Sequence, residues 1–265
     1  GSAEGERIRI DKDGRLLMGS AANSHNGGDL IQLSATSSTA SIQLNRYTAN
    51  QHPSYINFFK SRNASISGQT VVQDGDTLGL LAFYGSDGTD RALGAEVCAQ
   101  VDGTPGSDDM PGRLVFRTST DGSQSPTEKL RITSGDLASF GNSSPNAWQT
   151  GGDYYNIQLG NAGYLRADTD AGGNFFSYGV NLYRDNSGWK FIENGRGTQI
   201  SHGIGNTAIT FYGTNSGNAG GTPSFFEMLR LDVNGDVVCG SGNLVLTDGQ
   251  GISFAADGNA GGMTS

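Results

Sequence analysis

The chain has 265 residues, a formal net charge of −9 and 42 glycines, and only 35% of its residues are hydrophobic. Nucleic acids and anionic membrane surfaces bind clustered Lys and Arg, and this sequence contains no basic run. Its apolar stretches are far shorter than the roughly 20 residues that span a bilayer. We therefore expect no nucleic-acid partner and no insertion into a membrane.

Large side chains are few for a chain of this length, but they are spread along all of it. The sequence has 12 Phe, 9 Tyr and 2 Trp, which a disordered segment would lack. So many glycines beside so few bulky residues leave little material for a core within one chain. We expect a folded protein that gains part of its burial by packing against identical copies.

Short runs with alternating apolar residues predict strands throughout the chain, and no helical periodicity lasts three turns. Clusters of Gly, Asn and Asp between the runs predict tight turns. The sequence therefore predicts an all-β fold of short strands. The predicted strands include Ile42–Leu44, Ile56–Phe58, Leu78–Leu80, Leu114–Phe116, Ile157–Leu159, Val180–Leu182, Trp189–Phe191, Ile209–Phe211, Leu244–Leu246 and Ile252–Phe254.

One sequence motif, called the repeated phrase below, occurs three times, at residues 4–20, 127–142 and 226–241. Asp13-Gly14 in the first copy and Asn234-Gly235 in the third are hairpin signals between two strands. The middle copy, with Ser134-Gly135, is one residue shorter by sequence, so we expect a different turn there. A calcium loop is the alternative, but the distal Glu and the flanking helices of an EF-hand are missing.

The alternation of side chains in this phrase has a consequence for its charges. In the middle copy, Glu128, Leu130 and Ile132 should share one face, and Arg131 should lie on the other. The repeated Glu and Arg then cannot pair within one straight strand. We expect each to find its partner on a neighbouring strand or on another chain.

The repetition extends beyond the phrase and suggests tandem modules. Residues 27–29 (GGD) recur as 151–153, and residues 57–60 (NFFK) recur as 181–184 (NLYR), both at an offset of 124. We predict the end of one module at 1–20, a full module at 21–140, a shorter one at 141–241, and the start of a further segment at 242–265. Repeats of this size exceed those of ordinary solenoids, so each is predicted to be a small module on a common axis.

Several segments carry a resemblance to a known family. Residues 75–89, 95–106, 109–116 and 126–132 resemble the module of bacteriophage tail fibres and related virion appendages. Residues 9–14 and 251–256 resemble segments of the same fibres, especially those of phages that infect cyanobacteria and other aquatic bacteria. The resemblance is strongest over about residues 75–132 and patchy over 142–225.

The resemblance implies an elongated, β-rich homotrimer that forms part of the virion and folds in the host cytoplasm before assembly. Its implied partners are other tail or baseplate proteins and a host surface glycan or outer-membrane receptor. Such fibres often continue into a chaperone or tip domain, neither of which is recognisable here, so we expect this chain to be a fragment.

Enzymatic chemistry has little support in the sequence. A polysaccharide-degrading tailspike needs two carboxylates across a sugar-binding groove, and Asp108-Asp109, Asp168 with Asp170, and Glu193 are the available candidates. None of the three histidines lies beside a nucleophile elbow. Cys98 and Cys239 have no metal-ligand spacing and are predicted to be ordinary strand residues. We predict no catalytic residue, no metal site and no cofactor.

Binding of a carbohydrate without cleavage is the sharper hypothesis. Tyr154 and Tyr155 are neighbours in a predicted strand, so their rings should point to opposite sides and one ring should be exposed. We predict these two residues as receptor contacts, and packing in the core for Trp189. The predicted function is attachment of a phage to its host; a purely structural spacer or a depolymerase are the alternatives. The second module concentrates the aromatic residues Trp148, Tyr154, Tyr155, Tyr164, Tyr178, Tyr183 and Trp189.

Overall fold

The computed structural model describes residues 8–18, 29–36, 40–149, 154–168, 175–203 and 207–240. These residues form strands, turns and irregular segments without a helix, which confirms the predicted all-β class. Accordingly, the described part of the chain has no helix that could cross a membrane. The chain divides into two compact units, Gly1–Asn57 and Phe58–Ser265, which are described separately below. The four predicted module boundaries stay a prediction.

The first unit contains a small sheet of three strands. Strand β1 (Ile8–Ile10) pairs antiparallel with β2 (Leu16–Met18), and β2 pairs parallel with β3 (Ile31–Leu33). The predicted hairpin therefore exists, and its turn is closed by Asp11. The Asp11 carboxylate accepts hydrogen bonds from the backbone N–H groups of Asp13 and Arg15, both at 2.9 Å.

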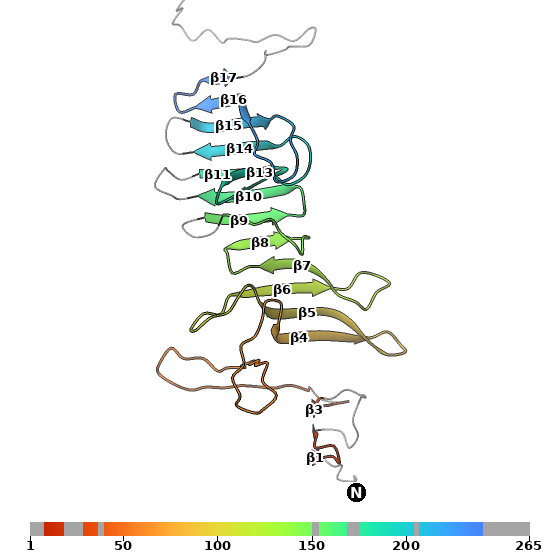
Figure 1. Ribbon diagram of the computed structural model, residues 1–265. Coiled ribbons are helices and arrows are strands. Elements are labelled where there is room, and N and C mark those ends of the chain that lie inside the picture. Colours follow the sequence, from red (N-terminus) through yellow and green to blue (C-terminus); the bar gives the residue numbers. More distant parts are fainter. Residues whose placement is uncertain are drawn as a thin grey trace, which may run out of the picture. The chain divides into compact units, whose positions relative to one another are not determined.

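The second unit is built on one sheet of twelve strands that follow one another in chain order (Figure 1). All neighbours pair antiparallel except β8 and β9, which pair parallel. Two further strands, β12 (Leu182–Asp185) and β13 (Gly188–Phe191), form a separate hairpin. The strands of the large sheet are β4 (Thr77–Ser86), β5 (Arg91–Val101), β6 (Gly112–Thr118), β7 (Thr127–Ile132), β8 (Leu137–Phe140), β9 (Tyr154–Leu159), β10 (Gly163–Asp168), β11 (Phe175–Val180), β14 (Thr198–Gly203), β15 (Thr207–Thr214), β16 (Phe225–Asp232) and β17 (Val237–Cys239).

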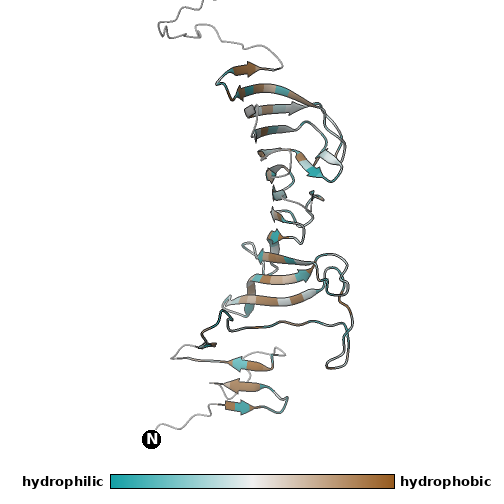
Figure 2. Cartoon of the chain, turned by 90° about the vertical axis from the view of Figure 1, so that its left-hand side faces the viewer, coloured by the Kyte–Doolittle hydropathy of each residue, from teal (hydrophilic) through white to brown (hydrophobic). Residues whose placement is uncertain are grey.

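The pairing register sorts the side chains of this sheet onto two chemically different faces. Hydrophobic and hydrophilic residues alternate along its strands, as the colours of Figure 2 show. One side, called the apolar face below, has no Asp, Glu, Lys or Arg at its paired positions from Leu81 to Val237. Its larger members are Leu81, Phe83, Val97, Val101, Leu114, Phe116, Leu130, Ile132, Phe140, Tyr155, Ile157, Leu159, Leu165, Phe176, Tyr178, Val180, Ile200, Ile209, Phe211, Phe226, Leu229, Leu231 and Val237.

Much of the apolar face is open to solvent in the single chain. Phe83 is 55% exposed, Ile132 47%, Val180 53% and Val237 66%, so exposure extends from the first strands of the sheet to the last. Nothing within the described residues of the chain covers these side chains. The apolar face is therefore a large hydrophobic surface that one chain leaves unburied.

The other side, called the polar face below, carries hydrogen-bonding side chains that interact across neighbouring strands. Arg117 bonds Glu96, and the guanidinium of Arg113 bonds the Gln100 side chain at 3.0 Å and Asp102 at 2.8 Å. The remaining members include Arg131, Ser139, Asn156, Gln158, Arg166, Ser177, Gln199, Ser201, Thr210 and Arg230.

The prediction that the repeated Glu and Arg cannot pair within their own strand is wrong. Arg131 Nη2 donates to Glu128 Oε2 at 2.8 Å, three residues back in β7. The reason is a β-bulge: Phe116 pairs with Leu130 and Arg117 with Glu128, so Lys129 is an extra residue and Glu128 moves to the face of Arg131. The same bulge occurs in β16, where Phe211 pairs with Leu229 and Tyr212 with Glu227. Glu227 therefore lies on the face of Arg230, and Arg230 Nε donates to Glu227 Oε1 at 3.1 Å.

The β12–β13 hairpin leaves the sheet because of a left-handed residue. Asn181 has a φ of 59°, a conformation that Asn adopts more readily than most residues. Its side chain holds the crossing by donating to the carbonyls of Glu193 and Arg196 at 3.2 and 3.0 Å. The run Val180–Leu182, predicted as one strand, is therefore the junction between β11 and β12.

The main hydrophobic core lies between this hairpin and the polar face. Leu182 and Phe191 of the hairpin are 0% and 1% exposed, and they form one cluster with Leu137, Trp148 and Tyr164. Gly197 permits the close packing, since a Cβ there would lie 2.6 Å from Leu182 Cγ. The polar face thus carries the main buried cluster, while most large side chains of the apolar face are left out of it.

The hairpin turns of the three repeated phrases are equally long, contrary to the prediction for the middle one. In each copy the paired residues that flank the turn are six positions apart: Ile10 with Leu16, Ile132 with Ala138, and Leu231 with Val237. The middle copy places Asp136, at a φ of 57°, where the others have a left-handed glycine. Because the middle copy has Asp136 and not a glycine at the left-handed position, the sequence did not show that its turn has the same length as the other two.

Other strand predictions had mixed outcomes. Residues 42–44 and 56–58 alternate in hydropathy but form no strand, because no strand among the described residues pairs with them, and their side chains are exposed. Residues 244–246 and 252–254 lie outside the described residues. Cys98 and Cys239 are free and lie in β5 and β17, as predicted.

Candidate functional site

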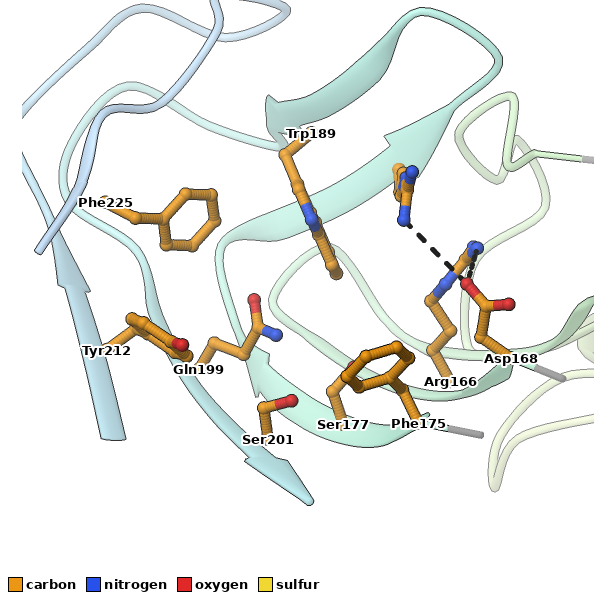
Figure 3. Close-up of a pocket in the computed structure, with 10 residues that line it drawn as sticks. Arg166, Asp168, Phe175, Ser177, Trp189, Gln199, Ser201, Tyr212 and Phe225 are labelled. Carbon is orange, nitrogen blue, oxygen red and sulfur yellow. Dashed lines mark hydrogen bonds and ion pairs between the residues drawn. The ribbon is translucent and has the colours of Figure 1, made fainter. Parts of the chain in front are cut away.

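A cavity of about 350 Å³ lies on the polar face, between the sheet and the β12–β13 hairpin (Figure 3). It draws side chains from five strands of the sheet and from the hairpin, so residues far apart in the sequence meet in it. Its lining consists of Arg166, Asp168, Phe175, Ser177, Arg184, Trp189, Gln199, Ser201, Tyr212 and Phe225.

A buried ion pair forms one end of the cavity. The side chains of Arg166 and Asp168 are 2% and 6% exposed, and Arg166 Nη2 donates to Asp168 Oδ2 at 3.1 Å. Burial lowers the pKa of Arg166, and the bond to Asp168 opposes that effect. Arg166 also donates to Asn156 and to Gln149, at 3.2 and 2.9 Å. These bonds hold the pair in one orientation.

A second guanidinium reaches the same carboxylate from the hairpin. Arg184 Nη1 lies 3.8 Å from Asp168 Oδ2. The Nε atom of Arg184 is buried and has no hydrogen-bond partner within the described residues. The cavity wall thus contains two positive groups and one negative group.

Aromatic rings form the other walls. Trp189 projects from the hairpin toward the sheet, with Phe225 on one side (Figure 3). The centroid of the Trp189 ring lies 5.5 Å from that of Tyr164 and 6.0 Å from that of Phe225. Tyr164 belongs to the buried core, so the Trp189 ring is supported from behind. The predicted core packing of Trp189 is confirmed in that the ring packs against the core cluster.

Small polar side chains lie on the strands opposite the hairpin. Ser177, Gln199 and Ser201 come from β11 and β14, and their side chains face the cavity (Figure 3). They supply two hydroxyls and one amide, which can donate and accept hydrogen bonds. The cavity therefore combines an aromatic wall, neutral polar groups and an ion pair with excess positive charge.

The structure places Tyr154 and Tyr155 on opposite faces, as their positions predicted, so they do not form one site. The guanidinium carbon of Arg166 lies 4.6 Å from the centroid of the Tyr154 ring, which is therefore near the cavity on the polar face. Tyr155 is 62% exposed on the apolar face. There it borders a hollow of about 360 Å³ with Ile157, Phe176 and other side chains.

The predicted carboxylate candidates are not brought together. Asp108 and Asp109 are exposed in a turn after β5, and Glu193 is exposed after the hairpin. Asp168 lies in the cavity, but Asp170 lies outside the described residues. Within the described residues that line the cavity, Asp168 is the single carboxylate.

Sequence reasoning missed most of the cavity. These residues belong to no recognisable motif, because their proximity depends on the register of three strands and on the fold of the hairpin. They are Arg166, Ser177, Arg184, Gln199 and Ser201. The one signal was the concentration of aromatic residues in this part of the chain, which includes Trp189.

Comparison with known proteins gives structural likenesses. Neither a protein-family model nor the sequence of a curated protein matches the chain. The chain is similar to the carboxy-terminal domain of the bacteriophage T5 L-shaped tail fibre, with 9% sequence identity and a TM-score of 0.42, over 83% of this chain and 99% of that chain. A structure of that domain with its intra-molecular chaperone domain gives 8% identity and a TM-score of 0.42, over 82% of this chain and 69% of that chain.

Proposed function

We propose that this chain is a segment of a homotrimeric bacteriophage tail fibre that takes part in attachment of the virion to its host. The observation that carries the proposal is the apolar face, which runs through the paired positions of the twelve-stranded sheet and is partly exposed in the single chain. The sequence resemblance of residues 75–132 to tail-fibre modules supplies the biological context.

The size of the apolar face supports packing between chains. Fourteen of its large side chains, from Leu81 to Val237, are at least 36% exposed. At about 75 Å² each they present on the order of 1,000 Å² of hydrophobic surface, where monomeric proteins rarely exceed a few hundred. A stable interface buries about 800 Å² per partner. The surface is therefore large enough for a permanent interface.

Identical copies fit this surface better than an unrelated partner. The absence of charged residues at its paired positions means that a second copy in register meets no like charge. A single-layered sheet with one apolar side can shelter that side in a closed bundle in which every copy turns it inward. The resemblance to tail fibres selects three copies, and the hollow beside Tyr155 can receive a side chain of a neighbour.

Adhesion then follows from the geometry of the bundle. If the apolar faces turn inward, the polar faces turn outward, and each of the three displays its cavity. Three identical weak sites on one rod convert low affinity into firm attachment through multivalency. Other tail or baseplate proteins and a host surface glycan or outer-membrane receptor are the proposed partners, and the virion is the proposed location.

Binding fits the cavity better than cleavage does. A glycosidase uses two carboxylates about 5–10 Å apart, whereas the described cavity lining contains Asp168 alone. Asp168 is also engaged with Arg166 and Arg184. Tyr154 stays a proposed receptor contact on the outward face; the same role for Tyr155 conflicts with the inward position that the trimer gives it.

Adsorption to whole cells tests the proposal. Fluorescently labelled protein is mixed with a panel of aquatic bacteria that includes cyanobacteria, and the bound fraction is measured by flow cytometry. We expect saturable binding to some strains, and weaker binding by the Tyr154→Ala variant. No binding to any strain would favour the structural spacer, and release of reducing ends from capsule or lipopolysaccharide would favour the depolymerase.

A further inference from the structure

The cavity beneath the β12–β13 hairpin has the features of a ligand site that remains accessible in an assembled fibre. It opens on the polar face, and the apolar face proposed for assembly lies on the other side of the same sheet. We propose that it binds a sugar residue that bears a carboxylate, such as a uronic acid of a bacterial surface polysaccharide. The inference deepens the attachment function proposed above and rests on it for its biological setting.

The size and the aromatic wall point to a sugar ring. A cavity of about 350 Å³ is at the small end of the range for ligand pockets and accommodates one or two pyranose rings. Pyranoses have a flat face of C–H groups that packs on an aromatic ring. The Trp189 ring is available for this contact, and its packing against Tyr164 and Phe225 keeps it in place.

The polar groups match the edge of a sugar ring. Ser177, Ser201 and Gln199 can each donate to and accept from hydroxyl groups. They lie on adjacent strands, since Ser177 pairs with Ser201 in the β11–β14 register. A row of neutral groups beside an aromatic wall is suited to a molecule with one apolar face and several hydroxyls.

The charges point to a carboxylate on that sugar. Two guanidinium groups, of Arg166 and Arg184, face one protein carboxylate, that of Asp168. The Arg184 side chain is 36% exposed, so its terminal nitrogens can donate charge-assisted hydrogen bonds to a ligand carboxylate. An inorganic anion could bind the guanidinium groups but could not pack on the Trp189 ring. A neutral sugar could pack on the ring but would leave the guanidinium groups without an anionic partner.

A matched pair of glycosides tests the inference on the 265-residue chain. Methyl β-glucuronide and methyl β-glucoside share the ring and differ in the carboxylate. We expect saturation-transfer NMR to show millimolar binding of the glucuronide, and binding of the glucoside that is about tenfold weaker. The Arg184→Gln variant should bind the two equally weakly, whereas Arg196→Gln, which removes the same charge from an exposed loop, should behave as the wild type.

A second measurement needs no substitution in the cavity. The chain has two tryptophans, so labelling with 5-fluorotryptophan gives two ¹⁹F resonances, which the spectrum of Trp189→Phe assigns. The glucuronide should shift the resonance of Trp189 and leave that of the buried Trp148 unchanged.

Three outcomes would overturn the inference: equal affinity for the two glycosides, unchanged glucuronide binding in Arg184→Gln, or no shift of the Trp189 resonance. Failure here is distinguishable from failure of the attachment function. A protein that adsorbs to cells but ignores the glucuronide contradicts this inference alone. A protein that binds the glucuronide but adsorbs to no cell contradicts the attachment function.

Discussion

A single charge placed in the apolar face should separate the chains of the proposed trimer. Ile132 lies in β7, between Leu114 of β6 and Ala138 of β8, and it is 47% exposed in the single chain. Because its side chain is already half in solvent, Ile132→Glu should perturb the fold of one chain little. In the trimer it would place three carboxylates against apolar surface.

The size of the effect follows from this exposure. Full burial of an isoleucine contributes about 1.5–3 kcal/mol, so burying the exposed half contributes about 1 kcal/mol per chain. Desolvation of a carboxylate adds at least about 2 kcal/mol per chain. Three chains together lose about 9 kcal/mol, which is roughly six orders of magnitude in the association constant.

Sedimentation velocity at micromolar concentration, with circular dichroism to check the fold, measures this change. We expect the wild type to sediment as a trimer and Ile132→Glu as a β-rich monomer. Ile66→Glu is the matched control, since Ile66 is 99% exposed in a turn before β4. A trimeric Ile132→Glu protein, or equal dissociation of the control, would refute the reasoning.

Three further predictions concern turns, packing and chain alignment. Burial alone would raise the pKa of Asp102, but hydrogen bonds from Ser134 and Arg113 outweigh it and lower the pKa. Asp102 therefore stabilises the fold above its unfolded-state pKa, and this contribution is lost as pH falls through the folded-state value. Asp102→Asn should cost about 1–2 kcal/mol at pH 7 and flatten the acid limb of a plot of Tm against pH; an unchanged acid limb would contradict this. Gly197→Ala should lower the free energy of unfolding, measured by thermal unfolding, by about 1–3 kcal/mol, because the new Cβ collides with the Leu182 side chain. Gly85→Ala is the control and should leave stability unchanged, since no heavy atom lies within 4 Å of its new Cβ. Cys239 is exposed and pairs with Leu229 on the apolar face. If the chains lie parallel and in register, mild oxidation should link two Cys239 residues into a covalent dimer, and Cys239→Ser should abolish this dimer. A wild-type protein that gives no covalent dimer would contradict the parallel, in-register alignment.

The all-β class, the hairpins and most strands could be predicted because they depend on local patterns. Asp-Gly and Asn-Gly turns and alternating hydropathy encode their conformations within a few residues. The structure shows this in the first and third phrases, where Asp11 and Asp232 hold the turns with the same backbone hydrogen bonds.

The wrong predictions concern places where one residue departs from regular strand alternation or from the usual residue type of a turn. Lys129 is an unpaired residue in β7, and it moves Glu128 to the face of Arg131, which strict alternation forbids. Asp136 occupies a left-handed position usually reserved for glycine. Neither side chain marks itself as special in the sequence, because bulges and turns are selected by the register of the neighbouring strand.

The candidate site could not be predicted from the sequence for a different reason. Arg166 and Arg184 meet at Asp168 only because Asn181 turns the chain out of the sheet and lets the hairpin fold back. Long-range register and this one crossing determine the cavity. Aromatic residues could be identified as a group, but their division between core, cavity wall and apolar face required the structure.

The central claim is that identical chains shelter their apolar faces against one another. Native mass spectrometry of the intact wild-type protein tests it most directly. We expect a species of three times the 27.6 kDa mass of one chain. A species of one chain mass that unfolds cooperatively in dilute solution would contradict it.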